Sequence, residues 1–230
     1  MATSGVTTYA MNAGQIVEKA FHRLGKASEG EAISARMSSD GISSLNLLLK
    51  DLQAEEHLWT KSEGTLAMVA SQAGYTLSSI SPLRILSIRR RDTDSLDTPL
   101  SEISRQEYFD LPNKSTSTGT PVSYYLDPQR ANGVLYLWPA PNAAAVAEFT
   151  LYITYLRRIE DMTASNHDLD MPQEWLQGLV WALADDLETE YPVNDSRLAV
   201  KIERKANEFM AKMRAWDTEG ASIFMQPDLR

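Results

Sequence analysis

The spacing of apolar residues changes twice along this chain, and that change limits the folds it can adopt. Residues 12–25 and 34–56 carry apolar side chains three and four positions apart, which predicts two amphipathic helices. From residue 63 to about 160, short segments alternate apolar and polar side chains, as strands do. Residues 172–191 and 194–216 return to the helical spacing. The sequence therefore predicts an α+β fold.

Two helices, a β-rich insertion and two further helices close most simply as an antiparallel bundle of about four helices, from which the insertion projects as a lobe. The predicted bundle takes residues 9–60 and 171–217, and the predicted insertion takes residues 63–160. Within the insertion, residues 92–121 are rich in turn formers and are expected to form a long surface excursion. Residues 218–230 lack periodicity and are expected to form an extended C-terminal arm.

The segment GVLYLWPAPNAAAVAEFTLYITYLRRIED, residues 133–161, is expected to form a wide hairpin. Its first strand, Val134 to Trp138, is apolar on both faces, and its second, residues 148–155, places one apolar face inward. Pro139 and Pro141 end the first strand, because proline has no N–H to donate to a sheet. Such a hairpin is a candidate surface for assembly.

Charge and composition exclude several classes of protein. With 22 basic and 31 acidic residues, the chain has a net charge of −9, which argues against an extended DNA-gripping surface. It has no cysteine, so disulfides, thiolate zinc sites and cysteine nucleophiles are excluded. The first residues have neither a basic nor an apolar signal region, and no apolar stretch approaches the roughly 20 residues of a membrane span. We therefore expect a soluble protein.

Two acidic clusters raise the question of chemistry. Asp185, Asp186, Glu188 and Glu190 lie on one predicted helix and could serve in glycoside cleavage, but a solvated face opposite the leucine stripe explains them better. The cluster His167, Asp168 and Asp170 could hold a metal, but Asp170 already serves as a predicted helix cap near Pro172. We therefore predict no catalytic residue, no metal, no cofactor and no enzyme activity.

Arginines and aromatic residues are the better candidates for contacts. Arg89 to Arg91, Arg157 and Arg158 could meet phosphate, or Arg89 to Arg91 could pair with Asp92 and Asp94; protein contacts are favoured. Five large side chains of the last two helices are expected in the core: Trp175, Trp181, Phe209, Met213 and Trp216. Because Trp181 lies off the leucine stripe, we expect it to contact a neighbouring subunit.

Four stretches, in this order and spacing, resemble one family. They are SLNLLLKDLQAEEHLW (44 to 59), GTPVSYYLDP (119 to 128), the 133–161 segment with its LWPAP, and DMPQEWLQGLVWALADDLETEY (170 to 191). Together they resemble the head-to-tail adaptor proteins of short-tailed bacteriophages, also called connector, tail tubular or tail accessory proteins. The resemblance covers most of the chain.

The resemblance implies a structural virion protein at the head–tail junction, assembled in the host cytoplasm as a ring of about twelve copies. The ring would join the portal to the tail nozzle and line a channel through which DNA passes without sequence-specific binding. It would serve tail assembly and retention of packaged DNA, with no membrane contact. The arm, through Ile223, Phe224 and Met225, would bind the portal. The subunit or nozzle interface would hold Tyr136, Trp138, Pro139, Pro141, Arg157, Arg158 and Trp181.

Two other functions stay open at this point. A neck or head-completion protein of a longer-tailed phage would share the ring but bind different partners. A wall-degrading or glycan-binding virion protein would use the acidic helix instead.

Overall fold

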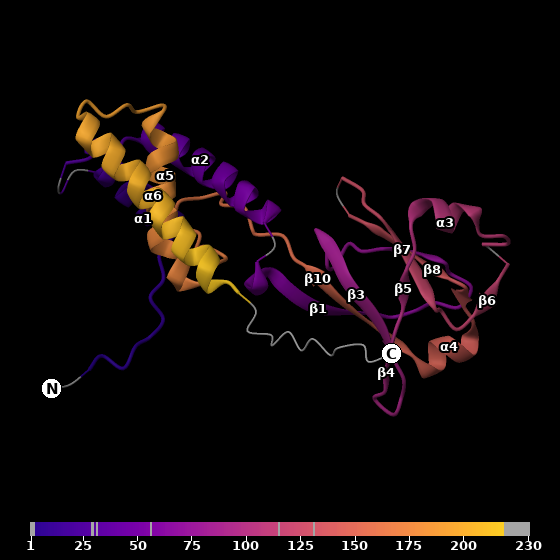
Figure 1. The fold of residues 1–230 in the computed structure, drawn as a ribbon. Coiled ribbons are helices and arrows are strands. Elements are labelled where there is room, and N and C mark those ends of the chain that lie inside the picture. Colours follow the sequence, from indigo (N-terminus) through magenta and orange to yellow (C-terminus); the bar gives the residue numbers. More distant parts are fainter. Residues whose placement is uncertain are drawn as a thin grey trace, which may run out of the picture. The chain divides into compact units, whose positions relative to one another are not determined.

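A computed structural model describes residues 3–28, 30, 32–55, 57–114, 116–130 and 132–218. These residues form six α-helices, two short 3-10 helices and ten strands (Figure 1), so the predicted α+β class is confirmed. The chain divides into two compact units. The helical unit takes the residues up to Trp59 and from Ile159 onward, and the β unit is Thr60–Arg158. The predicted domain limits stay predictions, and residues 219–230 of the predicted arm lie outside the described residues.

Four long helices share the core of the helical unit: α1 (Ala13–Arg23), α2 (Ala35–Ala54), α5 (Leu176–Glu188) and α6 (Ser196–Trp216). Side chains fix where three of them begin, because Asn12, Ser34 and Asp195 each accept a backbone N–H of the first turn. Gly25, with φ +67°, follows the end of α1. The four helices were predicted near these limits, whereas a regular antiparallel bundle stays a prediction.

Helix α5 is the centre of this unit, since it packs against α1, α2 and α6. Its leucine stripe is fully buried, as predicted, with Leu183 and Leu187 both 0% exposed. Two expectations for the last two helices are wrong. Trp216 is 59% exposed and is no core residue. Asp170 caps no helix: Pro172 precedes the short helix η2 (Gln173–Trp175), and the Asp170 carboxylate accepts the Glu160 N–H at 3.4 Å instead.

The β unit contains two four-stranded sheets and a two-stranded one. The first sheet is antiparallel, in the order β1 (Lys61–Leu66), β10 (Thr150–Leu156), β3 (Arg84–Arg91), β4 (Asp97–Pro99). The second has the order β2 (Gly74–Thr76), β8 (Val134–Trp138), β7 (Ser123–Asp127), β5 (Ser101–Glu102). The third pairs β6 (Thr118–Gly119) with β9 (Ala140–Pro141). Residues from both larger sheets share one hydrophobic core, including Leu135, Leu137, Leu151 and Ile153.

The predicted hairpin is wrong, although both of its strands exist. β8 pairs with β2 and β7, whereas β10 pairs with β1 and β3, so the two strands lie in different sheets. The residues between them form a helix, α4 (Ala143–Glu148), because the Asn142 side chain accepts the Ala145 N–H at 2.7 Å and alanines follow.

Residues 92–121 are also more ordered than the expected surface excursion. They hold β4, β5, β6 and a helix, α3 (Arg105–Asp110), which starts with a capping box between Ser104 and Glu107. Within the described part of the chain, none of the helices combines the length and apolarity that a bilayer crossing requires.

Candidate assembly surfaces

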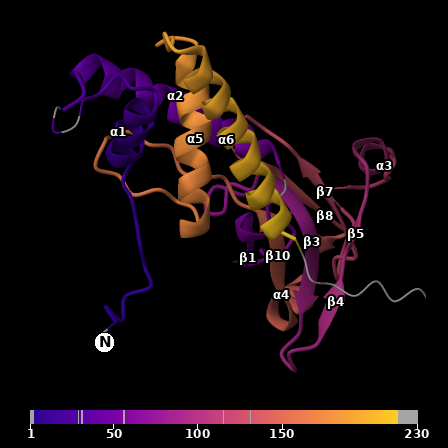
Figure 2. The same ribbon diagram turned by 60° about the vertical axis from the view of Figure 1, so that its left-hand side comes forward.

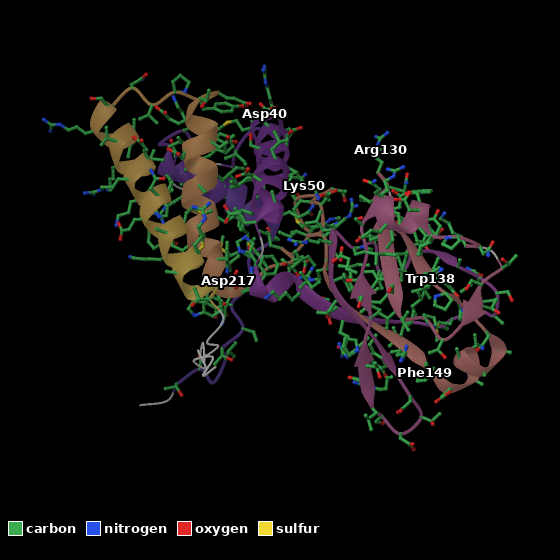
Figure 3. The ribbon with its side chains drawn as sticks, turned by 45° about the vertical axis from the view of Figure 1, so that its right-hand side comes forward. Asp40, Lys50, Arg130, Trp138, Phe149 and Asp217 are labelled. Atoms are coloured by element: carbon green, nitrogen blue, oxygen red, sulfur yellow. The ribbon has the colours of Figure 1, made fainter. Side chains whose placement is uncertain are left out.

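The residues of the predicted hairpin that were assigned to an interface lie in the body of the β unit. Tyr136 and Trp138 are half-buried in β8, and Pro141 is buried in β9. The Trp138 Nε1–H is buried and has no hydrogen-bond partner among the described residues. Figure 3 shows Trp138 within the β unit. These residues therefore form part of the sheet packing.

Tyr136 belongs to an aromatic cluster that joins α3 to the second sheet. Its ring centroid lies 6.0 Å from that of Tyr125 and 5.1 Å from that of Tyr108. Both Tyr108 and Tyr125 are buried, and burial is the main cause of their raised pKa values. Phe109, at the edge of the cluster, is 56% exposed, and Lys114 Nζ donates to its carbonyl oxygen at 2.5 Å. The cluster therefore leaves one aromatic ring open to a partner.

The three consecutive arginines of β3 bind within their own chain. Arg89 contacts the Glu63 carboxylate and donates to Asp97 at 2.9 Å, and Arg91 donates to both oxygens of Asp97 at 2.7 and 2.8 Å. The Arg91 guanidinium lies 4.1 Å from the centroid of the Tyr152 ring. These arginines, Arg91 first, lower the pKa of Asp97 to about 2. We call Glu63, Arg89, Asp97 and Arg91 the charge ladder.

Pairing of these arginines with Asp92 and Asp94 was one of two open alternatives, and the ion pairs of the described residues use Glu63 and Asp97 instead. Asp92 uses its Oδ1 to accept the N–H groups of Asp94 and Leu96 at 3.0 and 2.8 Å. A local turn therefore competes successfully for that carboxylate. Arg90 donates to the Pro121 carbonyl at 2.6 Å.

The other predicted interface residues are scattered. Arg157 and Arg158 follow β10, where Arg157 is half-buried and Arg158 is exposed. Trp181 is only 6% exposed on α5 and is covered by Arg23, whose guanidinium lies 4.3 Å from the ring centroid. Little of its surface is left for a neighbouring subunit. The predicted portal anchors Ile223, Phe224 and Met225 lie outside the described residues.

The two clusters considered as sites of chemistry, one with Asp185 and one with His167, lie in different surroundings. Asp185 lies where α5 packs on α6, and its pKa is raised by burial first, then by Glu203, Glu188 and Asp186. His167 belongs to a segment that hydrogen-bonds to the start of α1, where its carbonyl accepts the Ala13 N–H at 2.9 Å. In the described residues, no three His, Cys, Asp or Glu side chains are grouped to hold a metal ion.

Sequence reasoning missed a buried polar pair that fixes the end of α6. His57 Nδ1 and Asp217 Oδ2 lie 2.8 Å apart, and each side chain is 4% exposed. Beside them Arg214 donates to both oxygens of Glu55 at 2.9 and 2.5 Å, and this bond is the main cause of the lowered Glu55 pKa. Figure 3 shows Asp217 at the end of α6. The residues next to His57 and Asp217 in the sequence give no indication of this pair, whose members are 160 residues apart.

Comparisons with known proteins give one strong match. The sequence matches the family described as SU10 adaptor protein over residues 11–226. A search of curated proteins found no match. Among solved structures, the chain is similar to one described as the neck of an empty GTA particle computed with C6 symmetry, at 14% identity, with 89% of this chain and 95% of that chain covered and a TM-score of 0.30. A second is described as the neck of a native GTA particle computed with C12 symmetry, at 12% identity, 87% and 94% coverage and a TM-score of 0.28.

Similarity to solved structures at this level supports no inference about function. The family match is different, since it spans nearly all of the 230 residues. It agrees with the predicted resemblance to adaptor proteins, whereas the restriction to short-tailed phages stays a prediction. The chain therefore belongs to the SU10 adaptor protein family.

Proposed function

We propose that this protein is a structural virion protein at the head–tail junction of a bacteriophage, where it forms a ring between the portal and the tail nozzle. The observation that carries the proposal is the match to an adaptor family over residues 11–226. The ring lines the DNA channel and serves tail assembly and retention of packaged DNA. It assembles in the host cytoplasm, and its role is mechanical, without catalysis or cofactor.

Physical arguments support a ring as the working form. One contact between two different surfaces of the same chain, repeated by rotation, closes a ring, here of about twelve copies. The net charge of −9 suits the wall of a conduit, because like-charge repulsion keeps DNA from adhering to it.

We assign the partner surfaces by region. The C-terminal segment with Ile223, Phe224 and Met225 binds the portal. In the β unit, the half-buried residues Tyr136, Trp138 and Pro139, with exposed Arg158 after β10, face the next subunit or the nozzle. Pro141 of the β unit and Trp181 of the helical unit are buried, so we assign neither of them to a partner surface.

The test is the mass of the protein alone and after mixing with portal rings of the same phage, by native mass spectrometry. We expect about twelve copies on each portal ring. A variant that ends at Thr218 should bind the portal much more weakly, and a variant with Arg130→Ala, a change far from the deleted segment in sequence, serves as the control.

Other outcomes discriminate the alternatives. A protein that ignores portal rings but joins a preassembled portal–adaptor complex is a neck or head-completion protein. A stable monomer that binds neither assembly and cleaves peptidoglycan, with loss of cleavage in Asp185→Asn, overturns the structural role.

A further inference from the structure

The first half of α6 presents a basic surface with an apolar centre. Arg197, Val200, Lys201 and Arg204 lie three and four positions apart, so they share one face of the helix, and Val200 is 63% exposed. With Ser196 they line a shallow hollow of about 420 Å³. Arg197, Lys201 and Arg204 make no ion pair with any described carboxylate. We call these four residues the basic stripe.

A second hollow, with the opposite charge at its rim, lies beside the start of α1. It measures about 260 Å³, and its apolar lining includes Met11, Leu169, Met171 and Leu176. Asp168 also lines it. Glu174 directly follows the lining residue Gln173 in the sequence. We call this hollow with Asp168 and Glu174 the acidic-rimmed hollow.

Two carboxylates on this second surface lack an ion-pair partner among the described residues. Residues 160–174 contain five carboxylates and neither Lys nor Arg. Asp161 is paired with Lys50 of α2. Asp168 and Glu174 are exposed and have no cation at ion-pair distance among the described residues. The hollow therefore joins an apolar floor to a negative rim.

The two surfaces lie on different sides of the helical unit. Helix α5 packs against α6 on one side and α1 on the other, and residues 165 and 167 are hydrogen-bonded to the start of α1. Figure 2 shows α6 on one side of α5, with α1 and the segment before α5 on the other. One copy cannot bring its own two surfaces together, but two copies can.

We infer that the basic stripe of one copy docks on the acidic-rimmed hollow of the next, with Val200 entering the hollow and Lys201 and Arg204 facing Asp168 and Glu174. The inference rests on the proposed ring and names the contact that repeats around it. Two different surfaces of one chain make a heterologous contact, which is the kind that closes rings. Charges at the rim set the register and the salt dependence of such a contact.

Duplex DNA is the other polyanion that the basic stripe could meet, and the observations favour a second copy. From Arg197 to Arg204 the stripe spans only about 10 Å of helix axis, enough for a few phosphates. An exposed valine at its centre contributes nothing to a phosphate contact, but it can enter an apolar hollow. The net charge of −9 also opposes DNA binding.

Cross-linking tests the contact directly, because the chain has no cysteine of its own. One sample carries Val200→Cys and a second carries Met171→Cys. Mixed, assembled with or without portal rings and treated with a short bismaleimide, they should give a cross-linked pair of chains. Ala215→Cys, on the exposed face of α6 but beyond the stripe, replaces Val200→Cys in the control and should give at least about tenfold less product.

Charge reversal tests the rim. Lys201→Glu with Arg204→Glu should weaken self-association about tenfold, as should Asp168→Lys with Glu174→Lys. The chain with all four changes restores opposite charges and should associate to within about threefold of the original. Circular dichroism verifies that each variant is folded, as expected for exposed positions.

The outcomes separate this inference from the proposed function. Rings that form without the Val200→Cys to Met171→Cys product overturn the contact and leave the ring standing. No self-association, alone or on portal rings, overturns both. Loss of duplex DNA binding in Lys201→Glu with Arg204→Glu, with association unchanged, assigns the stripe to DNA and overturns the contact.

Discussion

The charge ladder of the β unit and the unpaired charges of the helical unit behave in opposite ways. In the β unit the charge ladder runs from Glu63 on β1 to Asp97 on β4, and Arg89 joins the two carboxylates. In the helical unit the basic stripe stays unpaired, and Asp185 lies against other carboxylates. The pKa of Asp97 is therefore lowered and that of Asp185 raised. The charges of the ladder therefore stabilise their own unit. The basic stripe and Asp185 make no ion pair among the described residues, although other charges of the helical unit, such as Arg214 with Glu55 and Lys50 with Asp161, are paired.

The difference has a local cause. Neighbouring strands bring side chains on one face of a sheet within about 5 Å of one another, so opposite charges on adjacent strands pair readily. On a helix, positions four apart are neighbours, and Arg197 and Lys201 place like charges there, which costs a few tenths of a kcal/mol. The helical unit therefore carries a small loss of stability on this face of α6.

The strongest test asks whether the two units are independent. Leu137→Ala in the β unit, or Leu183→Ala in the helical unit, should lower the free energy of unfolding by about 2–5 kcal/mol, because each side chain is fully buried. Hydrogen exchange should accelerate only in the unit that carries the change. Equal acceleration in both units after either change would show that they unfold together and would weaken the comparison.

A smaller effect tests whether the charge ladder stabilises the fold. Arg89→Met should lower the free energy of unfolding by about 1 kcal/mol, because two carboxylates lose a shared cation whose side chain is only 24% exposed. The matched change Arg204→Met removes an unpaired arginine and should stay within about 0.5 kcal/mol. Urea unfolding measures both. Equal losses would mean that the two units use their arginines alike.

A change of opposite sign is expected in the acidic helix. Asp185→Asn should raise the free energy of unfolding by about 0.5 kcal/mol at pH 7, because it removes a part-buried charge that neighbouring carboxylates repel. Asp186→Asn, at an exposed position of the same helix, is the control and should change it less. Destabilisation by Asp185→Asn in the same urea experiment would show that Asp185 has an unrecognised favourable contact.

Local sequence signals predicted the elements well. The limits of α1 and α2 follow from Asn12, Ser34 and Gly25, whose capping roles depend on neighbours within a few residues. The alternation around Leu151 and Ile153 predicted their inward face, and both are 0% exposed. Patterns of this kind depend on residues within one element, so they can be recognised from the sequence without knowledge of the fold.

Pairing between distant elements was not predictable in the same way. The sequences around Leu137 and Leu151 are compatible with two strands of one hairpin and with strands of two different sheets. The helix that begins after Asn142 lies between these strands, and they belong to different sheets. Arg89 contacts Glu63, on a strand two places across the sheet, rather than nearby Asp94. The His57–Asp217 pair was missed because nothing near either residue indicates the other. Residues of an interface were the hardest to predict, because an interface depends on which side chains the fold leaves exposed.

The smallest expected effect is a difference in pH dependence. The pKa of Asp97 is about 2 in the folded protein, against about 3.9 in an unfolded chain. A lowered folded-state pKa adds stability above about pH 4, and this stability is lost as the pH falls toward 2. Asp97→Asn lacks that contribution, so the unfolding midpoints of the variant and the original protein should converge between pH 4 and 2.

Asp185 gives the opposite trend, because its folded-state pKa is raised. Its ionised form is disfavoured in the folded protein, so the penalty is present at neutral pH and disappears as the pH falls below the usual Asp range. The higher stability of Asp185→Asn relative to the original protein should therefore shrink as the pH falls. The lower stability of Asp97→Asn should shrink between pH 4 and 2. Urea midpoints at pH 7, 5, 4, 3 and 2 measure both. Two differences of the same sign would contradict the idea that Asp97 stabilises its unit and that Asp185 does not.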